Sequence, residues 1–135
     1  EFKIFFRNDV RIQIIESLLN NNNIEPIIDY KKSNLSPGSF IVFNNIIKNN
    51  KLNVNDHFSI NMEKILNLYK KEKNINFIKL ILHLADLYFV NVTDKKFDKI
   101  IDNKSFVIQN INKFVIYNLN QNSLINAINQ KLFNE

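Results

Sequence analysis

The pair His83 and Asp86 is the strongest candidate for chemistry in this sequence. The two residues lie three apart in a largely apolar segment, so on a helix they share one side and could act as an acid/base pair near a cleft. No third group completes a catalytic site around them. Because a buried polar pair at a helix–helix contact needs hydrogen-bond partners whether or not it is catalytic, we predict a structural role for this pair.

Metal-binding and nucleophilic chemistry find little support. Asp98 and Asp102 could share one helix face, but two carboxylates without a further ligand are a weak indication of a metal. The sequence has no cysteine, which removes thiolate zinc sites and cysteine nucleophiles, and its two histidines lack metal-ligand spacing. With a single glycine, Gly38, it cannot form a glycine-rich phosphate loop. We therefore expect no metal, no cofactor and no enzymatic activity.

Size and composition indicate a small folded protein. The chain has 135 residues, of which 45% are hydrophobic, enough for one compact domain or two very small ones. Asn, Ile and Lys contribute 26, 22 and 16 residues. Because these three residue types have A/T-rich codons, we interpret their abundance as a bias of the genome and not as a sign of function. The absence of cysteine fits a reducing compartment. The formal charge of +5 is carried mostly by lysines, so we expect at most weak, salt-sensitive, sequence-independent binding of nucleic acid.

The elements that would position these residues begin with a strand pattern. Apolar side chains recur at every second residue in two runs, first Phe2, Ile4 and Phe6, then Val10, Ile12 and Ile14. Arg11 and Gln13 alternate with the later ones, as in a half-buried strand. A second extended piece is expected between Ile24 and Tyr30, and Ser36-Pro37-Gly38 then signals a turn. We predict a small β-rich domain over residues 1–36.

After Gly38 the apolar spacing becomes helical. Helices are expected from Phe40 to about Ile47, from Ser59 or Asn61 through Tyr69, from about Asn74 to Val90, around 97–101, around 107–115, and from Asn122 or Ser123 to Leu132. The helix at 75–90 is apolar nearly all round and should be the central one, but it is too short and too often interrupted to span a membrane. The predicted class is α+β, with an α-helical domain over residues 37–135.

The apolar stripe of the last expected helix suggests a contact surface. A chain of this size buries a limited fraction of its surface, and apolar faces on at least five helices exceed what one small core readily absorbs. We predict that a subunit interface includes Phe114, Leu124, Ile125, Ile128 and Leu132. The alternative, left open by the sequence, is that these residues dock onto the helix at 75–90.

Two stretches of the N-terminal half have a characteristic sequence of residue types. The segment from Phe5 to Ile15 is rich in Phe, then acidic at Asp9, then rich in Val and Ile. Pro37-Gly38 is followed by an apolar helix that ends in a polar, basic run up to Lys51. A short extended piece comes next.

Two further segments continue this order. Met62 opens a helix that ends in Lys71-Glu72-Lys73, and Tyr117 to Asn120 leads into the terminal helix from Ser123 to Phe133. In this order the segments resemble the GINS complex subunit of the second-Psf type. The resemblance implies a non-catalytic structural subunit of a nuclear, four-protein assembly active in DNA replication. Its implied partners are the other GINS subunits and, through the complex, the MCM ring and the Cdc forty-five protein of the CMG helicase.

A rival resemblance leads to a different class of protein. Leu35 to Ile47, and Ile65 to Tyr69 followed by Leu82 to Tyr88, resemble the central helices of BTB/Skp1-like adaptors. We favour the GINS type because a BTB domain does not require the Asn-rich link and the terminal helix, and its first strands usually carry an Asp-Gly turn that is absent here. A secreted or viral host-modulating effector is a third alternative. The corresponding locations are the nucleus, the cytoplasm, or a secreted state after removal of a signal peptide.

Overall fold

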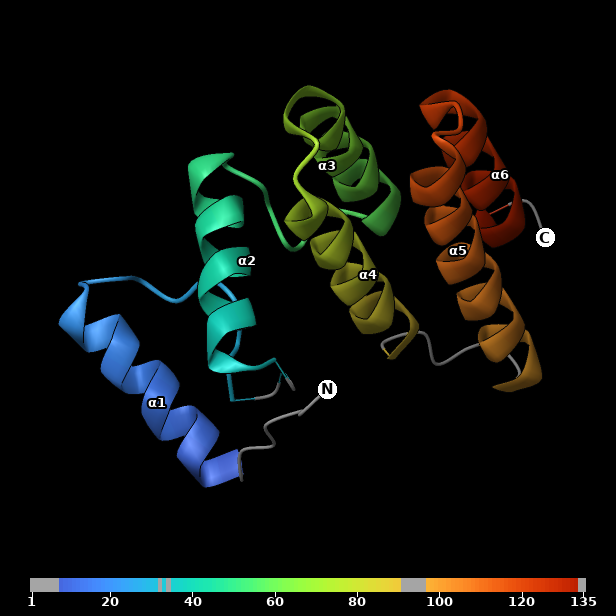
Figure 1. The fold of residues 1–135 in the computed structure, drawn as a ribbon. Helices are drawn as coiled ribbons and strands as arrows, with labels where there is room; N and C mark the ends of the chain where they lie inside the picture. The colour runs from blue at the N-terminus through green and yellow to red at the C-terminus, as the bar shows by residue number, and fades with distance from the viewer. Residues whose placement is uncertain (1–7, 32, 34, 91–96, 134–135) are drawn as a thin grey trace. The chain divides into compact units, whose positions relative to one another are not determined.

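The computed structural model describes residues 8–31, 33, 35–90 and 97–133, and these residues form six helices (Figure 1). The helices are α1 (Asn8–Asn21), α2 (Pro37–Asn49), α3 (Phe58–Glu72), α4 (Ile75–Val90), α5 (Phe97–Tyr117) and α6 (Gln121–Phe133). The chain divides into two compact units, Glu1–Val54 and Asn55–Glu135. The boundary expected between residues 36 and 37 falls inside the first unit.

The predicted α+β class is wrong, because the described residues contain helices and no strand. The alternating segment from Val10 to Ile14 belongs to α1, which buries Arg11, Ile15 and Leu19 at four-residue spacing. A four-residue spacing of buried side chains is typical of a helix. The pattern was missed because its first member, Arg11, is charged and was not expected to be buried. Phe2, Ile4 and Phe6 lie outside the described residues.

The first unit is a pair of helices, α1 packed on α2, joined by an irregular connection. The start of α2 follows from the turn signal in the sequence: Pro37 occupies the first turn, and the Ser36 hydroxyl accepts a 3.2 Å hydrogen bond from the Ser39 N–H. Proline tolerates this position because an N–H there would have no acceptor within the helix. Ser36-Pro37-Gly38 is therefore a helix start.

Buried polar side chains hold the irregular connection against the two helices. The Asn44 Oδ1 atom accepts from the N–H of Ile27 at 2.7 Å, and its Nδ2 atom donates to the Glu25 carbonyl at 3.0 Å. The Arg11 Nη1 atom donates to the Leu35 carbonyl at 3.1 Å. Because the connection lacks a regular backbone ladder, these two side chains satisfy backbone groups that would otherwise be left unpaired.

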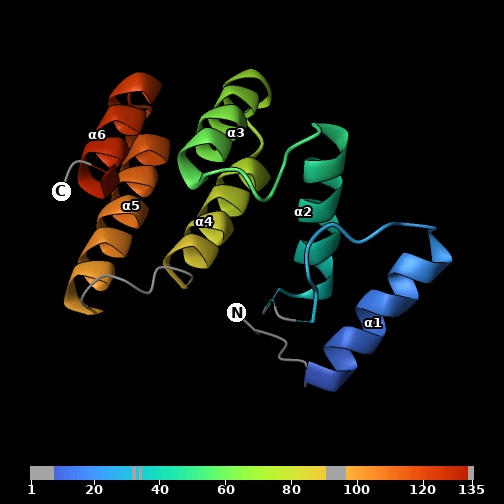
Figure 2. The ribbon, with the colours of Figure 1, turned by 180° about the vertical axis from the view of Figure 1, so that it is seen from behind.

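The second unit is a closed bundle of four helices. Helix α3 packs on α4, α4 on α5, α5 on α6, and α6 again on α3. Figures 1 and 2 show α5 and α6 side by side from opposite directions. The helix expected to be central, α4, buries six side chains, and α3 buries five. The two short helices expected around 97–101 and 107–115 are one continuous helix, α5.

The helices end in a way that reflects the scarcity of glycine. Four residues, Asn23, Lys51, Lys73 and Asn118, adopt a left-handed backbone with φ between 51° and 55°. Each follows a helix end, where glycine is the usual choice and asparagine the next. Within the described part of the chain, no helix combines the length and apolar character required to cross a membrane.

Candidate functional site

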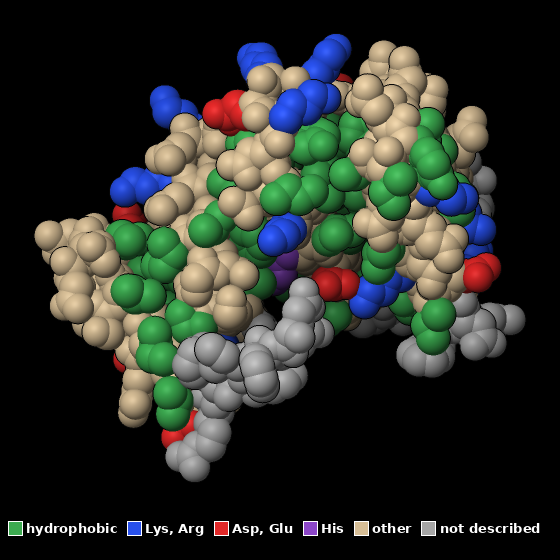
Figure 3. Space-filling model, viewed as in Figure 1, with side chains coloured by type: hydrophobic (Ala, Val, Ile, Leu, Met, Phe, Trp, Pro, Cys, Tyr) green, Lys and Arg blue, Asp and Glu red, His purple; other side chains and the backbone are tan. Residues whose placement is uncertain are grey.

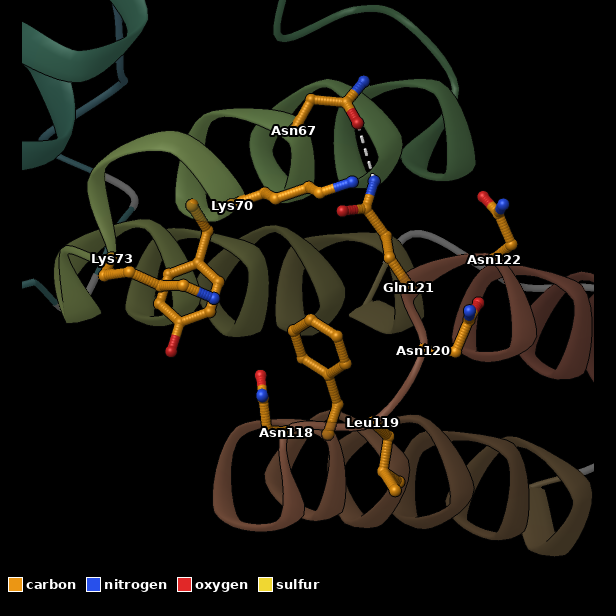
Figure 4. A pocket seen from close by; sticks show the side chains of 10 residues that line it. Asn67, Lys70, Lys73, Asn118, Leu119, Asn120, Gln121 and Asn122 are labelled. Atoms are coloured by element: carbon orange, nitrogen blue, oxygen red, sulfur yellow. Dashed lines mark hydrogen bonds between the residues drawn. The ribbon is translucent and has the colours of Figure 1, made fainter.

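A pocket of about 290 Å³ lies where α3, α5 and α6 meet at one end of the four-helix bundle (Figure 4). Amides, lysines and aromatic rings predominate in its lining, which consists of Asn67, Tyr69, Lys70, Lys73, Phe114, Asn118, Leu119, Asn120, Gln121 and Asn122. These residues come from the ends of α3 and α5, the turn after α5, and the first turn of α6. The pocket is thus built from helix ends.

Local backbone geometry brings these ends together. Helix α3 stops at Lys73, whose N–H donates to the Tyr69 carbonyl at 2.7 Å. After α5, the left-handed Asn118 reverses the chain, and the Asn120 side chain accepts from the Ser123 N–H at 3.1 Å. Asn120 therefore caps α6, because an Asn oxygen replaces an acceptor that the first turn of a helix lacks.

Two amides join opposite walls of the pocket. The Gln121 Nε2 atom of α6 donates to the Asn67 Oδ1 atom of α3 at 2.7 Å, shown as a dashed line in Figure 4. The other amide oxygen, Gln121 Oε1, is buried and has no hydrogen-bond partner among the described residues. A buried acceptor without a donor costs free energy. Because the surrounding protein shields this oxygen from solvent, a molecule in the pocket reaches it only if the Gln121 side chain moves.

The pocket carries positive charge from two lysines. In Figure 4, Lys70 extends toward the Asn67–Gln121 pair. The Lys73 ammonium lies 5.2 Å from the centre of the Tyr69 ring, a cation–π distance. The backbone N–H groups of Gln121 and of the next residue, Asn122, have no acceptor within α6 and add partial positive charge.

The dipoles of two other helices reduce the positive potential of the pocket. Helices α3 and α5 both end here with carbonyl groups, which carry partial negative charge. Full charges on two lysine side chains exceed these partial charges. Figure 3 shows Lys and Arg side chains gathered along the upper edge of the view, above the end of α3. The net chemistry of the pocket favours an anionic group beside hydrogen-bonding groups.

The residues predicted to form a subunit interface are all buried in the described structure. Their exposed fractions are 9% or less, for Phe114, Leu124, Ile125, Ile128 and Leu132. Helix α6, which carries four of them, packs on α3 and α5. The docking alternative named α4 as the acceptor helix, whereas the observed neighbours are α3 and α5. An interface made by these residues stays a prediction, and it would require α6 to leave its present place.

Asp86 lies on the side of α4 that approaches α5. Asp86 Oδ1 forms an ion pair with Lys104 Nζ of α5 at 2.9 Å. Burial lowers the pKa of His83 below the usual 6.5, and the negative charge of Asp86 partly offsets this shift. Asp86 thus contributes to the contact between α4 and α5, and neither residue of the pair lines the pocket.

The described residues contain no group of three His, Cys, Asp or Glu side chains placed to hold a metal ion. Asp102 is exposed on α5, and the side chain of Asp98 lies outside the described residues. The pocket was not predicted from the sequence. Its lysines were interpreted as general basicity and its asparagines as composition. The one available signal was the concentration of polar residues at the end of α3 and between the end of α5 and the start of α6.

Comparisons with family models, with curated proteins and with solved structures found no match to this chain.

Proposed function

We propose that this chain is a non-catalytic binding subunit whose pocket at the end of the α3–α6 bundle holds an anionic group. The observation that carries this proposal is the convergence of Lys70, Lys73 and the first turn of α6 on one pocket of about 290 Å³. The pocket lining includes no carboxylate to repel an anion and no imidazole to act as a general base. Its amides and lysines are suited to binding.

Titration of the isotope-labelled protein with inorganic phosphate tests this proposal. Amide NMR signals of Asn118, Asn120, Gln121 and Asn122 should shift together, with saturation in the millimolar range expected for a few exposed charge contacts. Replacing Lys70 by Gln should weaken binding several-fold, because one of the two full charges is lost.

Lys71→Gln provides the matched control. Lys71 is exposed, belongs to the same last turn of α3 and does not line the pocket. Its replacement removes the same net charge and should leave the phosphate affinity nearly unchanged. Equal losses in the Lys70 and Lys71 variants, or the absence of coordinated shifts around the pocket, would show that no anion site exists here.

A second candidate is the structural subunit of a GINS-like heterotetramer. One observation favours it: the helical segments on which the resemblance rests coincide with α2, α3 and α6. The strand expected from Phe5 to Ile15 has no counterpart, since α1 begins at Asn8. Co-expression with the other GINS subunits, followed by size-exclusion chromatography, tests this candidate. A chain that always elutes alone as a stable monomer would exclude it.

A further inference from the structure

Helix α5 carries apolar side chains on two opposite sides. One side is buried inside the bundle and includes Val107, Ile111 and Phe114. The other side, the outer stripe, repeats at intervals of three or four residues and consists of Ile101, Ser105, Ile108, Asn112 and Ile116. Such intervals align side chains along one side of a helix. At the two ends of the outer stripe, Ile101 is 48% exposed and Ile116 is 72% exposed.

The neighbours of α5 leave the outer stripe uncovered. Among the described residues, α4 and α6 are the helices that pack on α5. Lys104 of α5 forms the 2.9 Å ion pair with Asp86 of α4. On the other flank of α5, the centre of the Phe106 ring lies 5.7 Å from the Lys131 ammonium of α6. These two contacts occupy the flanks of α5, and the outer stripe lies between them on the solvent side.

Two residues of opposite charge lie on one flank of the outer stripe. Asp102 and Lys113 are eleven residues apart, close to three full turns, so they project in nearly the same direction about 16 Å apart along the helix. Both are exposed, and neither has an ionic partner within the described part of the chain. The flank is thus acidic toward the start of α5 and basic toward its end.

We propose that the outer stripe of α5 binds the same stripe of a second copy of this chain, in an antiparallel dimer. A twofold axis perpendicular to α5 near Ile108 places Ile101 of one copy beside Ile116 of the other. The same axis brings the same flank of both helices together, so Asp102 of each copy faces Lys113 of the other. A parallel pair would join opposite flanks and leave these charges apart. The charges on this face are therefore complementary to those of a second copy.

Sedimentation velocity of the full chain at low salt tests the dimer. The contact is small, so the mass should rise from 16.0 kDa toward twice that value as the protein concentration increases through the micromolar range. Ile116→Asp should raise the dissociation constant at least tenfold, because both copies would bring a carboxylate into the apolar contact. The matched control is Ile60→Asp, since Ile60 is 46% exposed and belongs to α3. It should leave the dimer unchanged, and circular dichroism should show both variants folded.

Charge exchange tests the antiparallel arrangement. Asp102→Lys alone, or Lys113→Asp alone, replaces two attractions across the axis by two repulsions and should weaken the dimer about tenfold at low salt. An equimolar mixture of these two variants should dimerise again, because each variant then meets the opposite charge. The chain carrying both substitutions should also dimerise.

Three results would overturn the proposal. A chain that stays monomeric at every concentration would exclude the dimer and leave the outer stripe to a different protein. Equal loss in Ile116→Asp and Ile60→Asp would show that the contact does not lie on α5. A dimer that is unaffected by either charge substitution would exclude the antiparallel arrangement.

Discussion

The two units of this protein use polar side chains in opposite ways. In the first unit, Asn44 is fully buried and Arg11 is 6% exposed, and both hold backbone groups of the irregular connection between α1 and α2. In the four-helix bundle, the polar residues Asn120, Gln121 and Asn122 gather at one open end around a pocket. Asn44 and Arg11 are thus structural, and so is Asn120, which caps α6, whereas the exposed Asn122 side chain can contact a ligand in the pocket.

The two units use polar side chains differently because they enclose their apolar cores in different ways. Two helices alone cannot surround a core, so the first unit adds the irregular segment containing Ile28 and must satisfy its backbone groups from side chains. Four helices packed in a ring surround an apolar core that includes Met62, Ile65 and Ile111, all fully buried. The bundle also buries the amides of Asn61 and Asn103, but four helices enclose its core without an added irregular segment, and the polar residues at its helix ends line the pocket.

The largest effect on the free energy of unfolding is expected for substitution of Ile128, in the apolar core of the bundle. This side chain is fully buried, so Ile128→Ala should lower the free energy of unfolding by about 2–5 kcal/mol, and Ile128→Val by only about 0.5–1.5 kcal/mol. Chemical denaturation followed by circular dichroism measures both. Unchanged stability in the alanine variant would mean that Ile128 is not part of the bundle core and would return it to the predicted partner interface.

A smaller and more local effect is expected at Asn44 in the first unit. Asn44→Leu keeps the approximate volume but leaves the N–H of Ile27 and the carbonyl of Glu25 unpaired. This should cost about 1–3 kcal/mol. Hydrogen exchange of the Ile27 amide should accelerate strongly.

Asn44→Asp is the matched control for this comparison. It keeps the acceptor for Ile27 but replaces the donor to Glu25 by a buried carboxylate oxygen, which lowers overall stability. The protection of the Ile27 amide relative to its neighbours should nevertheless largely persist. If the Ile27 amide exchanged as slowly in Asn44→Leu as in the unaltered chain, the Asn44 side chain would not stabilise the connection between α1 and α2, and the proposed difference between the two units would be wrong.

The helices were predictable wherever the apolar spacing was uninterrupted. The apolar spacing from Phe40 to Ile47 predicted α2, and the stripe from Met62 to Tyr69 predicted α3, because these signals are local. The interpretation of Ser36-Pro37-Gly38 as a turn missed that Ser36 caps α2 and Pro37 begins it. The strand error at α1 arose because the sequence does not reveal that Arg11 is buried by a long-range bond to Leu35. The pocket was missed for a related reason: α3 and α6 residues such as Asn67 and Gln121 meet only through tertiary packing.

The smallest effect on stability is expected at His83, a histidine of α4 whose pKa changes on folding. Burial favours the neutral imidazole, so the folded protein holds its pKa below the ordinary 6.5. Between these two values the unfolded chain binds more protons than the folded one, and stability therefore rises with pH. The contribution of His83 is complete above about pH 6.5 and is lost as the pH falls through the lowered pKa. Urea unfolding at a series of pH values should show this decline, and His83→Gln should flatten it.

The variant Asp86→Asn separates the ionic contact from the burial of His83. The Asp86 and Lys104 side chains are 54% and 41% exposed, so loss of their ion pair should cost no more than about 1 kcal/mol. Because the charge of Asp86 raises the pKa of His83 against the effect of burial, its removal should move the imidazole titration to still lower pH. NMR titration of the His83 ring measures this directly. A rise in the pKa of His83, or no change, would mean that Asp86 does not act on the imidazole, and burial alone would then account for the shift.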